Sequence, residues 1–194
     1  MKLDSVEGTA KILRVLVEIA LVCNVILVYL VPVAVMLDQH SLLGGVEAYL
    51  SGILRPGEDD IVGAAAAASF LSWVWVWGEV HRLVLAAFLV VSGVCTAAIL
   101  LQARRVLKTI AAGTPFSPEN AVSLRRAAAC CFVIAGAALA RVLFSVWFYR
   151  SPLPLASYNA LFVPMFAMGG LLCLVMSALF RQAAELKEEN DLTI

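Results

Sequence analysis

The amino-acid sequence predicts an all-α integral membrane protein, a four-helix bundle with interfacial helices in its first outer loop. The 194 residues are 62% apolar and their mean hydropathy is +0.94, which is well above the average of a soluble domain. A helix needs roughly 20 apolar residues to cross the hydrocarbon core of a bilayer. Four runs of about this length are the expected spans: residues 15–37, 83–101, 127–149 and 161–180.

The first expected span lies near the N-terminus, where a signal peptide would also lie. It carries Glu18 and Asn24, and no small-residue cleavage site precedes Asp38. The run is also too long for the apolar core of a signal peptide. We therefore expect a helix that is retained in the mature protein.

The distribution of Lys and Arg predicts the orientation, because short cytoplasmic segments are enriched in these residues. Ten of the 14 lie in the N-terminal segment, the loop 102–126 and the tail 181–194. We therefore expect a multi-pass protein of the inner membrane with both termini in the cytoplasm. Because 14 Asp and Glu balance these cations, we expect no direct contact with nucleic acid.

The expected outer loop, residues 38–82, contains a further apolar run at 61–78. Counting it as a span would move the five cations of the loop 102–126 to the outer side, so it is not expected to cross the membrane. Its indole rings at Trp73, Trp75 and Trp77 favour either a helix at the outer membrane surface or an extension of the second span. Residues 46–54 show helical spacing of apolar positions, which predicts a short interfacial helix.

Ionisable and polar side chains inside a span are costly, at roughly 2.5 to 3.5 kcal/mol for a charge. The expected spans contain Glu18, Asn24 and Arg141. Counting about 1.5 Å per residue puts Glu18 near 5 Å and Arg141 near 20 Å from the cytoplasmic side, so we do not expect these two to pair. We expect the Glu18 side chain to reach either the cytoplasmic interface or Arg14, which lies one turn before it.

Arg141 has two interpretations. Its long side chain can extend outward toward Asp38 or Glu79 in a purely structural role. It can also line an outward cavity, which would make the chain a small-solute or lipid-binding or transport protein.

We expect no enzymatic activity, cofactor or metal. No nucleophile elbow, zinc-protease motif or phosphate-binding loop is visible. All five cysteines lie in expected spans without a CxxC spacing, which favours buried apolar thiols. His40 and His81 at the outer ends of the first two spans leave a haem or cation site as a weaker alternative.

The loop 102–126 contains the stretch Gly-Thr-Pro-Phe-Ser-Pro-Glu-Asn at residues 113–120. Ser117 can cap a helix that starts at Pro118, with Glu119 near the positive end of its dipole. This account leaves Phe116 and Asn120 unexplained. The tail ends in Glu-Asn-Asp-Leu-Thr-Ile at residues 189–194, an acidic turn followed by apolar residues.

These two stretches resemble the bacterial inner-membrane family known as domain of unknown function 2975. The resemblance implies a four-span layout without an assigned enzymatic activity, and an association with small helix-turn-helix regulators that are often encoded beside family members. The matching positions are Gly113, Pro115, Phe116, Glu119, Asn120, Leu124 and Arg125 in the loop, and Asn190, Asp191, Leu192, Thr193 and Ile194 in the tail.

The expected function is therefore regulatory: loop and tail form one cytoplasmic surface that binds a partner, such as a small helix-turn-helix regulator. The rival interpretation is that loop and tail pack on each other and stabilise the bundle. Small residues at Gly93, Gly136 and Gly169 to Gly170 permit close helix packing within one chain or in a homo-oligomer. The expected partner-binding residues are Phe116, Glu119, Asn120, Arg125, Asp191, Leu192 and Ile194.

Overall fold

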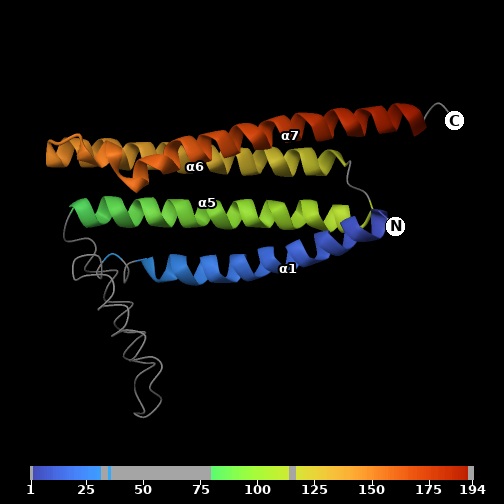
Figure 1. The fold of residues 1–194 in the computed structure, drawn as a ribbon, viewed down its shortest axis with the longest axis horizontal. Helices are drawn as coiled ribbons and strands as arrows, with labels where there is room; N and C mark the ends of the chain where they lie inside the picture. Colours follow the sequence, from blue (N-terminus) through green and yellow to red (C-terminus); the bar gives the residue numbers. More distant parts are fainter. Residues whose placement is uncertain (1, 32–34, 36–79, 114–116, 192–194) are drawn as a thin grey trace, which may run out of the picture. The chain divides into compact units, whose positions relative to one another are not determined.

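The computed structural model describes residues 2–31, 35, 80–113 and 117–191, and the described part is almost entirely helical (Figure 1). Four helices are long and apolar enough to cross a membrane. The protein is thus a multi-pass membrane protein of all-α class, and the predicted four-helix architecture is confirmed. The long helices are α1 (Lys2–Tyr29), α5 (Val80–Ala111), α6 (Pro118–Tyr149) and α7 (Phe162–Asp191), and the short helices η1 (Leu153–Ala156) and η2 (Tyr158–Leu161) connect α6 to α7.

At the end of the molecule that carries the α5–α6 turn, the helices extend well past the predicted spans. At its other end, α1 stops at Tyr29, before the predicted end of the first span at residue 37. The predicted loop 102–126 is mostly helical, since α5 continues to Ala111 and α6 begins at Pro118. The predicted tail 181–194 is helical as far as Asp191. Hydropathy locates only the part of a helix that is apolar, whereas Ala, Arg, Lys, Glu and Leu in these extensions keep a high helix propensity.

Helix α6 is the most buried of the four, and its buried face is rich in alanine. These positions recur at intervals of three and four residues, the spacing of one helix face. Small side chains let neighbouring backbones approach closely, which favours helix association in lipid. The buried residues are Asn120, Ala121, Ser123, Ala127, Ala128, Cys131, Ile134, Ala135, Ala138 and Val142.

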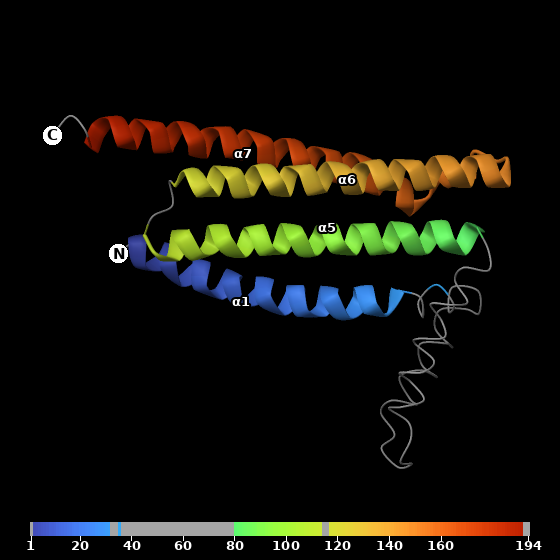
Figure 2. The same ribbon diagram turned by 180° about the vertical axis from the view of Figure 1, so that it is seen from behind.

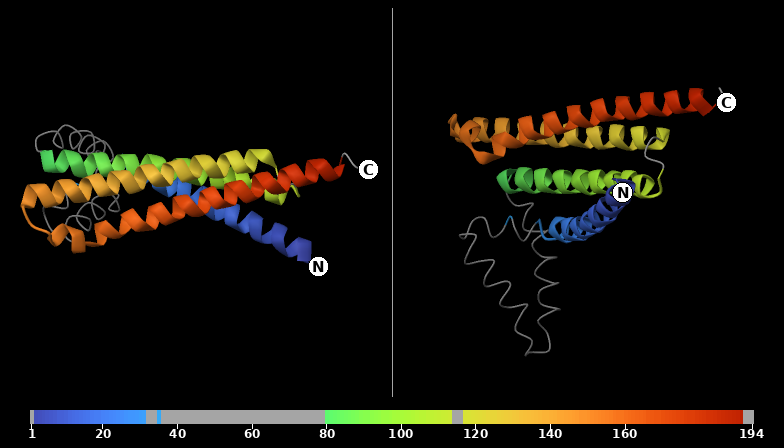
Figure 3. Two further views of the ribbon diagram at one scale, coloured as in Figure 1. Left: turned by 90° about the horizontal axis from the view of Figure 1, so that it is seen from above. Right: turned by 45° about the vertical axis from the view of Figure 1, so that its right-hand side comes forward.

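Helices α6 and α7 form an antiparallel pair that stays in contact along most of its length (Figures 2 and 3). Gly170 of α7 is buried, and a Cβ atom at this position would lie 3.0 to 3.2 Å from the ring of Phe132 in α6. The predicted close approach at Gly170 is therefore confirmed. Its neighbour Gly169 and Gly136 of α6, which the sequence also marked for close packing, have no such contact within 4 Å.

The chain divides into two compact units, one of residues 1–25 with 91–194 and one of residues 26–90. In the second unit, Val31, Val35 and Ala86 form a small buried cluster. The predicted helices at 46–54 and 61–78 lie outside the described residues.

Many large apolar side chains on α1 and α7 are more than half exposed, for example Val22 and Leu172. Such exposure over whole spans is expected for helix faces that contact lipid.

Candidate functional site

Helix α5 ends in a glycine turn that starts the sequence motif. Gly113 has a φ of +76°, in the left-handed region that glycine adopts without a Cβ penalty. Its N–H donates to the Ile110 carbonyl at 3.1 Å, and the Ala112 N–H donates to the Lys108 carbonyl at 3.1 Å. A Cβ at this position would meet nothing within 4 Å. The turn therefore favours glycine because of its backbone conformation and not because of a close contact.

The predicted start of α6 is confirmed at Ser117 and Pro118, with Glu119 in the first turn. Ser117 has the extended backbone of an N-cap, and its carbonyl accepts the Asn120 N–H at 3.1 Å. The predicted side-chain cap is not formed, because Ser117 Oγ is buried without a hydrogen-bond partner among the described residues. The helix start therefore relies on the backbone and on the fixed φ of Pro118.

Asn120, which the sequence left unexplained, connects the end of α5 to the start of α6. Its side chain is only 1% exposed. Its Nδ2 donates to Thr109 Oγ1 at 2.7 Å, and the Thr109 hydroxyl lies 2.9 Å from Asn120 Oδ1 and 2.8 Å from the Val106 carbonyl. The Asn120 amide is therefore buried and hydrogen-bonded within the chain, which fits a structural role better than a docking surface.

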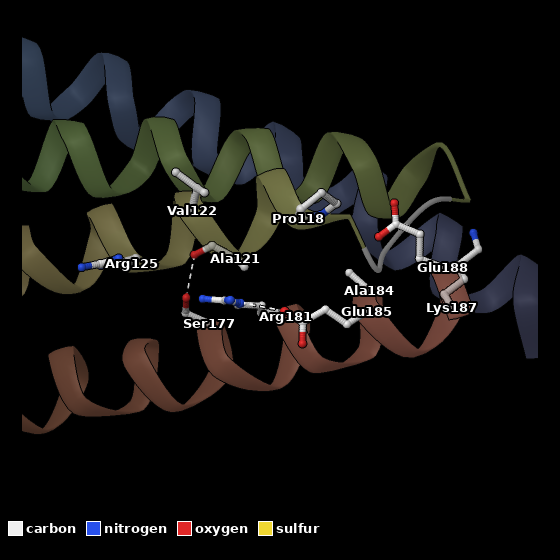
Figure 4. Close-up of a pocket in the computed structure, with 10 residues that line it drawn as sticks. All are labelled: Pro118, Ala121, Val122, Arg125, Ser177, Arg181, Ala184, Glu185, Lys187 and Glu188. Carbon is white, nitrogen blue, oxygen red and sulfur yellow. Dashed lines mark hydrogen bonds and ion pairs between the residues drawn. The ribbon is translucent and has the colours of Figure 1, made fainter. Parts of the chain in front are cut away.

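A groove of about 590 Å³, which we call the α6–α7 groove, lies between the first turns of α6 and the last turns of α7 (Figure 4). The Ser177 hydroxyl donates to the Ala121 carbonyl at 2.7 Å, and Arg181 Nε pairs with Glu185 Oε1 at 2.9 Å. The groove combines apolar side chains with charges of both signs. It is lined by Pro118, Ala121, Val122, Arg125, Ser177, Arg181, Ala184, Glu185, Lys187 and Glu188.

A second cavity of about 530 Å³, which we call the α5–α6 pocket, lies on the other side of the first turns of α6. Three cations and one carboxylate line it, so it is basic. Its residues are Arg105, Lys108, Thr109, Ala112, Glu119, Asn120, Val122, Ser123 and Arg126.

The two cavities share Val122 but otherwise divide the surface that the sequence treated as one. Arg125 lines the α6–α7 groove, whereas Glu119 lines the α5–α6 pocket. Sequence reasoning missed Arg105 and Lys108 as site residues. Their spacing of three residues on the α5 extension is the signal that puts them on one helix face.

Glu18 pairs with Arg14 at 3.2 Å, which confirms the predicted partner, and with Arg104 of α5 at 3.0 Å. The second contact was missed because Arg104 was assigned to a loop. All three side chains are about 40% exposed or more, so the pairs are partly screened. Asn24 Oδ1 is buried and has no hydrogen-bond partner among the described residues.

Arg141 lies in the second half of α6, and its Nη1 donates to Asn159 Oδ1 in η2 at 3.4 Å. The expected partners Asp38 and Glu79 lie outside the described residues. Both structural and ligand-binding interpretations of Arg141 stay predictions.

The remaining predicted residues are only partly described. Asp191 is the last residue of α7, whereas Phe116, Leu192, Ile194 and His40 lie outside the described residues. All five cysteines are free thiols. Within residues 2–31, 35, 80–113 and 117–191, no three His, Cys, Asp or Glu side chains are arranged to hold a metal ion.

Comparison with known proteins identifies the family. The model of the family described as "Protein of unknown function (DUF2975)" matches residues 64–194, which include α5, α6, α7 and both cavities. The chain belongs to this family. No curated protein and no solved structure matches the chain.

Proposed function

We propose that this protein is a non-enzymatic regulator of the bacterial inner membrane. The end of the molecule formed by the α5–α6 turn and the last turns of α7 faces the cytoplasm. There the α6–α7 groove binds a cytoplasmic protein such as a small helix-turn-helix regulator.

The charge distribution supports this orientation, because cytoplasmic ends of spans are enriched in Lys and Arg. The proposed cytoplasmic end also includes the N-terminus. The test is a pair of C-terminal fusions. A fluorescent protein that folds only in the cytoplasm should fluoresce, and a phosphatase that folds only in the periplasm should show no activity. Active phosphatase would contradict the orientation. The cations at this end, within the described helices after α1, are Arg104, Arg105, Lys108, Arg125, Arg126, Arg181 and Lys187.

The observation that carries the docking proposal is the α6–α7 groove itself. Its α7 side runs from Ser177 to Glu188, which is about 17 Å, or about three helical turns. Val122 in the groove is 49% exposed although it precedes the predicted span. A groove with exposed apolar side chains and charged edges suits an amphipathic partner helix.

The sequence flanking the groove supports the same function. Phe116 precedes the groove residue Pro118 by two positions, and Leu192 follows Glu188 by four. Both are apolar residues beyond the predicted spans, where lipid tails do not cover them.

The experiment is copurification from native membranes in a gentle detergent, with quantitative mass spectrometry. The variant V122E/R125E places carboxylates in the groove. Because Val122 also lines the α5–α6 pocket, R125E alone, at a residue that lines only the groove, is measured beside it. R150E, at the opposite end of α6, is the matched charge reversal. We expect a DNA-binding protein that copurifies with the wild type and R150E but is reduced at least about tenfold with V122E/R125E, the loss of about 1.4 kcal/mol. A second variant, F116A with deletion of residues 191–194, should reduce the same protein.

The rival is that these segments only stabilise the bundle. It predicts a lower melting temperature of V122E/R125E in detergent and no differential partner. Asn120, which is buried and bonded to Thr109, fits that structural role, whereas the exposed Arg125 fits docking.

A further inference from the structure

We propose that the α5–α6 pocket is a binding site for the phosphate headgroup of an anionic glycerophospholipid. This inference does not depend on the docking function or on which leaflet the pocket faces. It rests on the net charge of the pocket, on its position relative to the predicted spans, and on the fact that its cations form no ion pairs within the described part of the chain.

The pocket has a clear excess of positive charge. Arg105 and Lys108 come from the last turns of α5, and Arg126 comes from α6, against the single carboxylate of Glu119. Within the described part of the chain, none of these three cations forms an ion pair. Arg105 Nη1 donates at 3.3 Å to the neutral amide oxygen of Gln102, so its charge is not compensated.

Relative to the predicted spans, the pocket begins at the depth of the lipid headgroups and extends just beyond it. Arg126 directly precedes the predicted span 127–149, and Arg105 and Lys108 follow the predicted span 83–101 by about 6 and 10 Å along α5. The headgroup layer occupies roughly 5 to 8 Å on each side of the hydrocarbon core. Basic pockets between helices at this depth are typical sites for anionic headgroups.

The floor of the pocket is preorganised. The Asn120 amide is buried and hydrogen-bonded to Thr109, which joins the two helices that carry the cations. Arg126 and Lys108 therefore lie on two helices that the Asn120–Thr109 hydrogen bond joins near their ends. The apolar side chains of Ala112 and Val122 line the remainder and suit the glycerol and upper acyl part of a lipid.

The test is a titration of the full-length protein in neutral detergent micelles with phosphatidylglycerol, followed by native mass spectrometry. In the variant K108Q/R126Q, each lost cation should weaken binding about fivefold, so the dissociation constant should rise about 30-fold. The matched control R125Q/K187Q removes two cations from the same end of the molecule but from the α6–α7 groove. It should change the constant less than about threefold.

Three further arms make the result decisive. Phosphatidylcholine should bind at least about tenfold more weakly than phosphatidylglycerol to the wild type. The charge-preserving swap K108R/R126K should retain most of the affinity. Inorganic phosphate should displace the lipid no better than chloride at equal ionic strength.

The proposal is overturned if K108Q/R126Q and R125Q/K187Q lose the lipid equally, which would mean general surface charge. It is also overturned if phosphatidylcholine binds as well, if the swap loses as much as the Gln variant, or if inorganic phosphate competes specifically, which would identify a free anion as the ligand. Monodisperse elution and a native circular dichroism spectrum of each variant exclude misfolding as the cause.

Discussion

The two sides of α6 are built differently. On the side of α7, the contact is made by a glycine against an aromatic ring and by a hydroxyl on a backbone carbonyl, and it opens into a groove with charges of both signs. On the side of α5, the contact includes a buried amide bonded to a hydroxyl, and it opens into a basic pocket. Adjacent residues such as Arg125 and Arg126 therefore serve different cavities.

The largest expected effect concerns the α7 side. Gly170→Leu should lower the free energy of unfolding in detergent by about 3 kcal/mol, because overpacking a close helix contact typically costs about 1 to 3 kcal/mol and here displaces the Phe132 ring. The destabilisation is measured by thermal unfolding in detergent, with size-exclusion chromatography to quantify the protein that remains folded at each temperature.

Gly169→Leu is the matched control, since a Cβ at Gly169 meets nothing within 4 Å. Phe132→Leu in the Gly170→Leu background should restore part of the loss. Equal destabilisation by the two Leu variants would contradict the close contact as the cause.

The second effect concerns the α5 side. Thr109→Val removes a hydrogen-bond partner of the buried Asn120 amide and should cost about 2 kcal/mol, within the range for a buried polar group that loses its partner. The measurement is a double-mutant cycle with Asn120→Leu, read by thermal unfolding. The double variant should be less destabilised than the sum by about 1 kcal/mol, and strict additivity would show that the two side chains do not cooperate.

A smaller effect is expected outside both sides of α6, at the Glu18 pairs. Glu18→Gln should destabilise by at most about 1 kcal/mol, because its pairs are partly exposed and screened by salt. The double swap E18R/R104E restores the pair between residues 18 and 104 but puts an arginine at position 18, one turn from Arg14, so it should recover only part of the difference at low ionic strength. A loss that does not depend on salt would indicate packing in place of charge.

The smallest effect is expected for Arg181→Gln in the groove. Arg181 and Glu185 are both exposed and one turn apart, and such pairs contribute about 0.3 to 0.5 kcal/mol. The melting temperature should stay within about 2 °C of the wild type. This variant therefore tests partner binding at the α6–α7 groove without a stability effect, and a large drop in melting temperature would make it unsuitable as evidence for docking.

The sequence predicted the class of the fold because its determinants are local: long apolar runs, a helix start at Ser117 and Pro118, and one carboxylate with a cation a turn away. It could not predict how far α5 and α7 continue beyond their spans, since hydropathy reports lipid contact and not helix ends. The site was only partly predicted for a related reason. Asn120 was identified as unusual, but its partner Thr109 lies 11 residues away in a segment that was assigned to a loop.

The charges of the site illustrate the same limit. Arg104 and Arg105 were counted for orientation as two equal cations, yet one pairs with Glu18 and the other lines a pocket. Consecutive residues on a helix point about 100° apart, and this difference in direction separates the two roles. Assigning residues to helix faces in this way requires the correct helix boundaries.

The continuity of α7 has a mechanical consequence. Its 30 residues run without a break from Phe162 to Asp191, a rod of about 45 Å. Helices of this kind tilt to match the thickness of the surrounding bilayer. If α7 pivots at its η2 end, a change in tilt of about 10° displaces the opposite tip sideways by about 8 Å, so a small change in the lipid becomes a large movement of the groove wall that α7 provides.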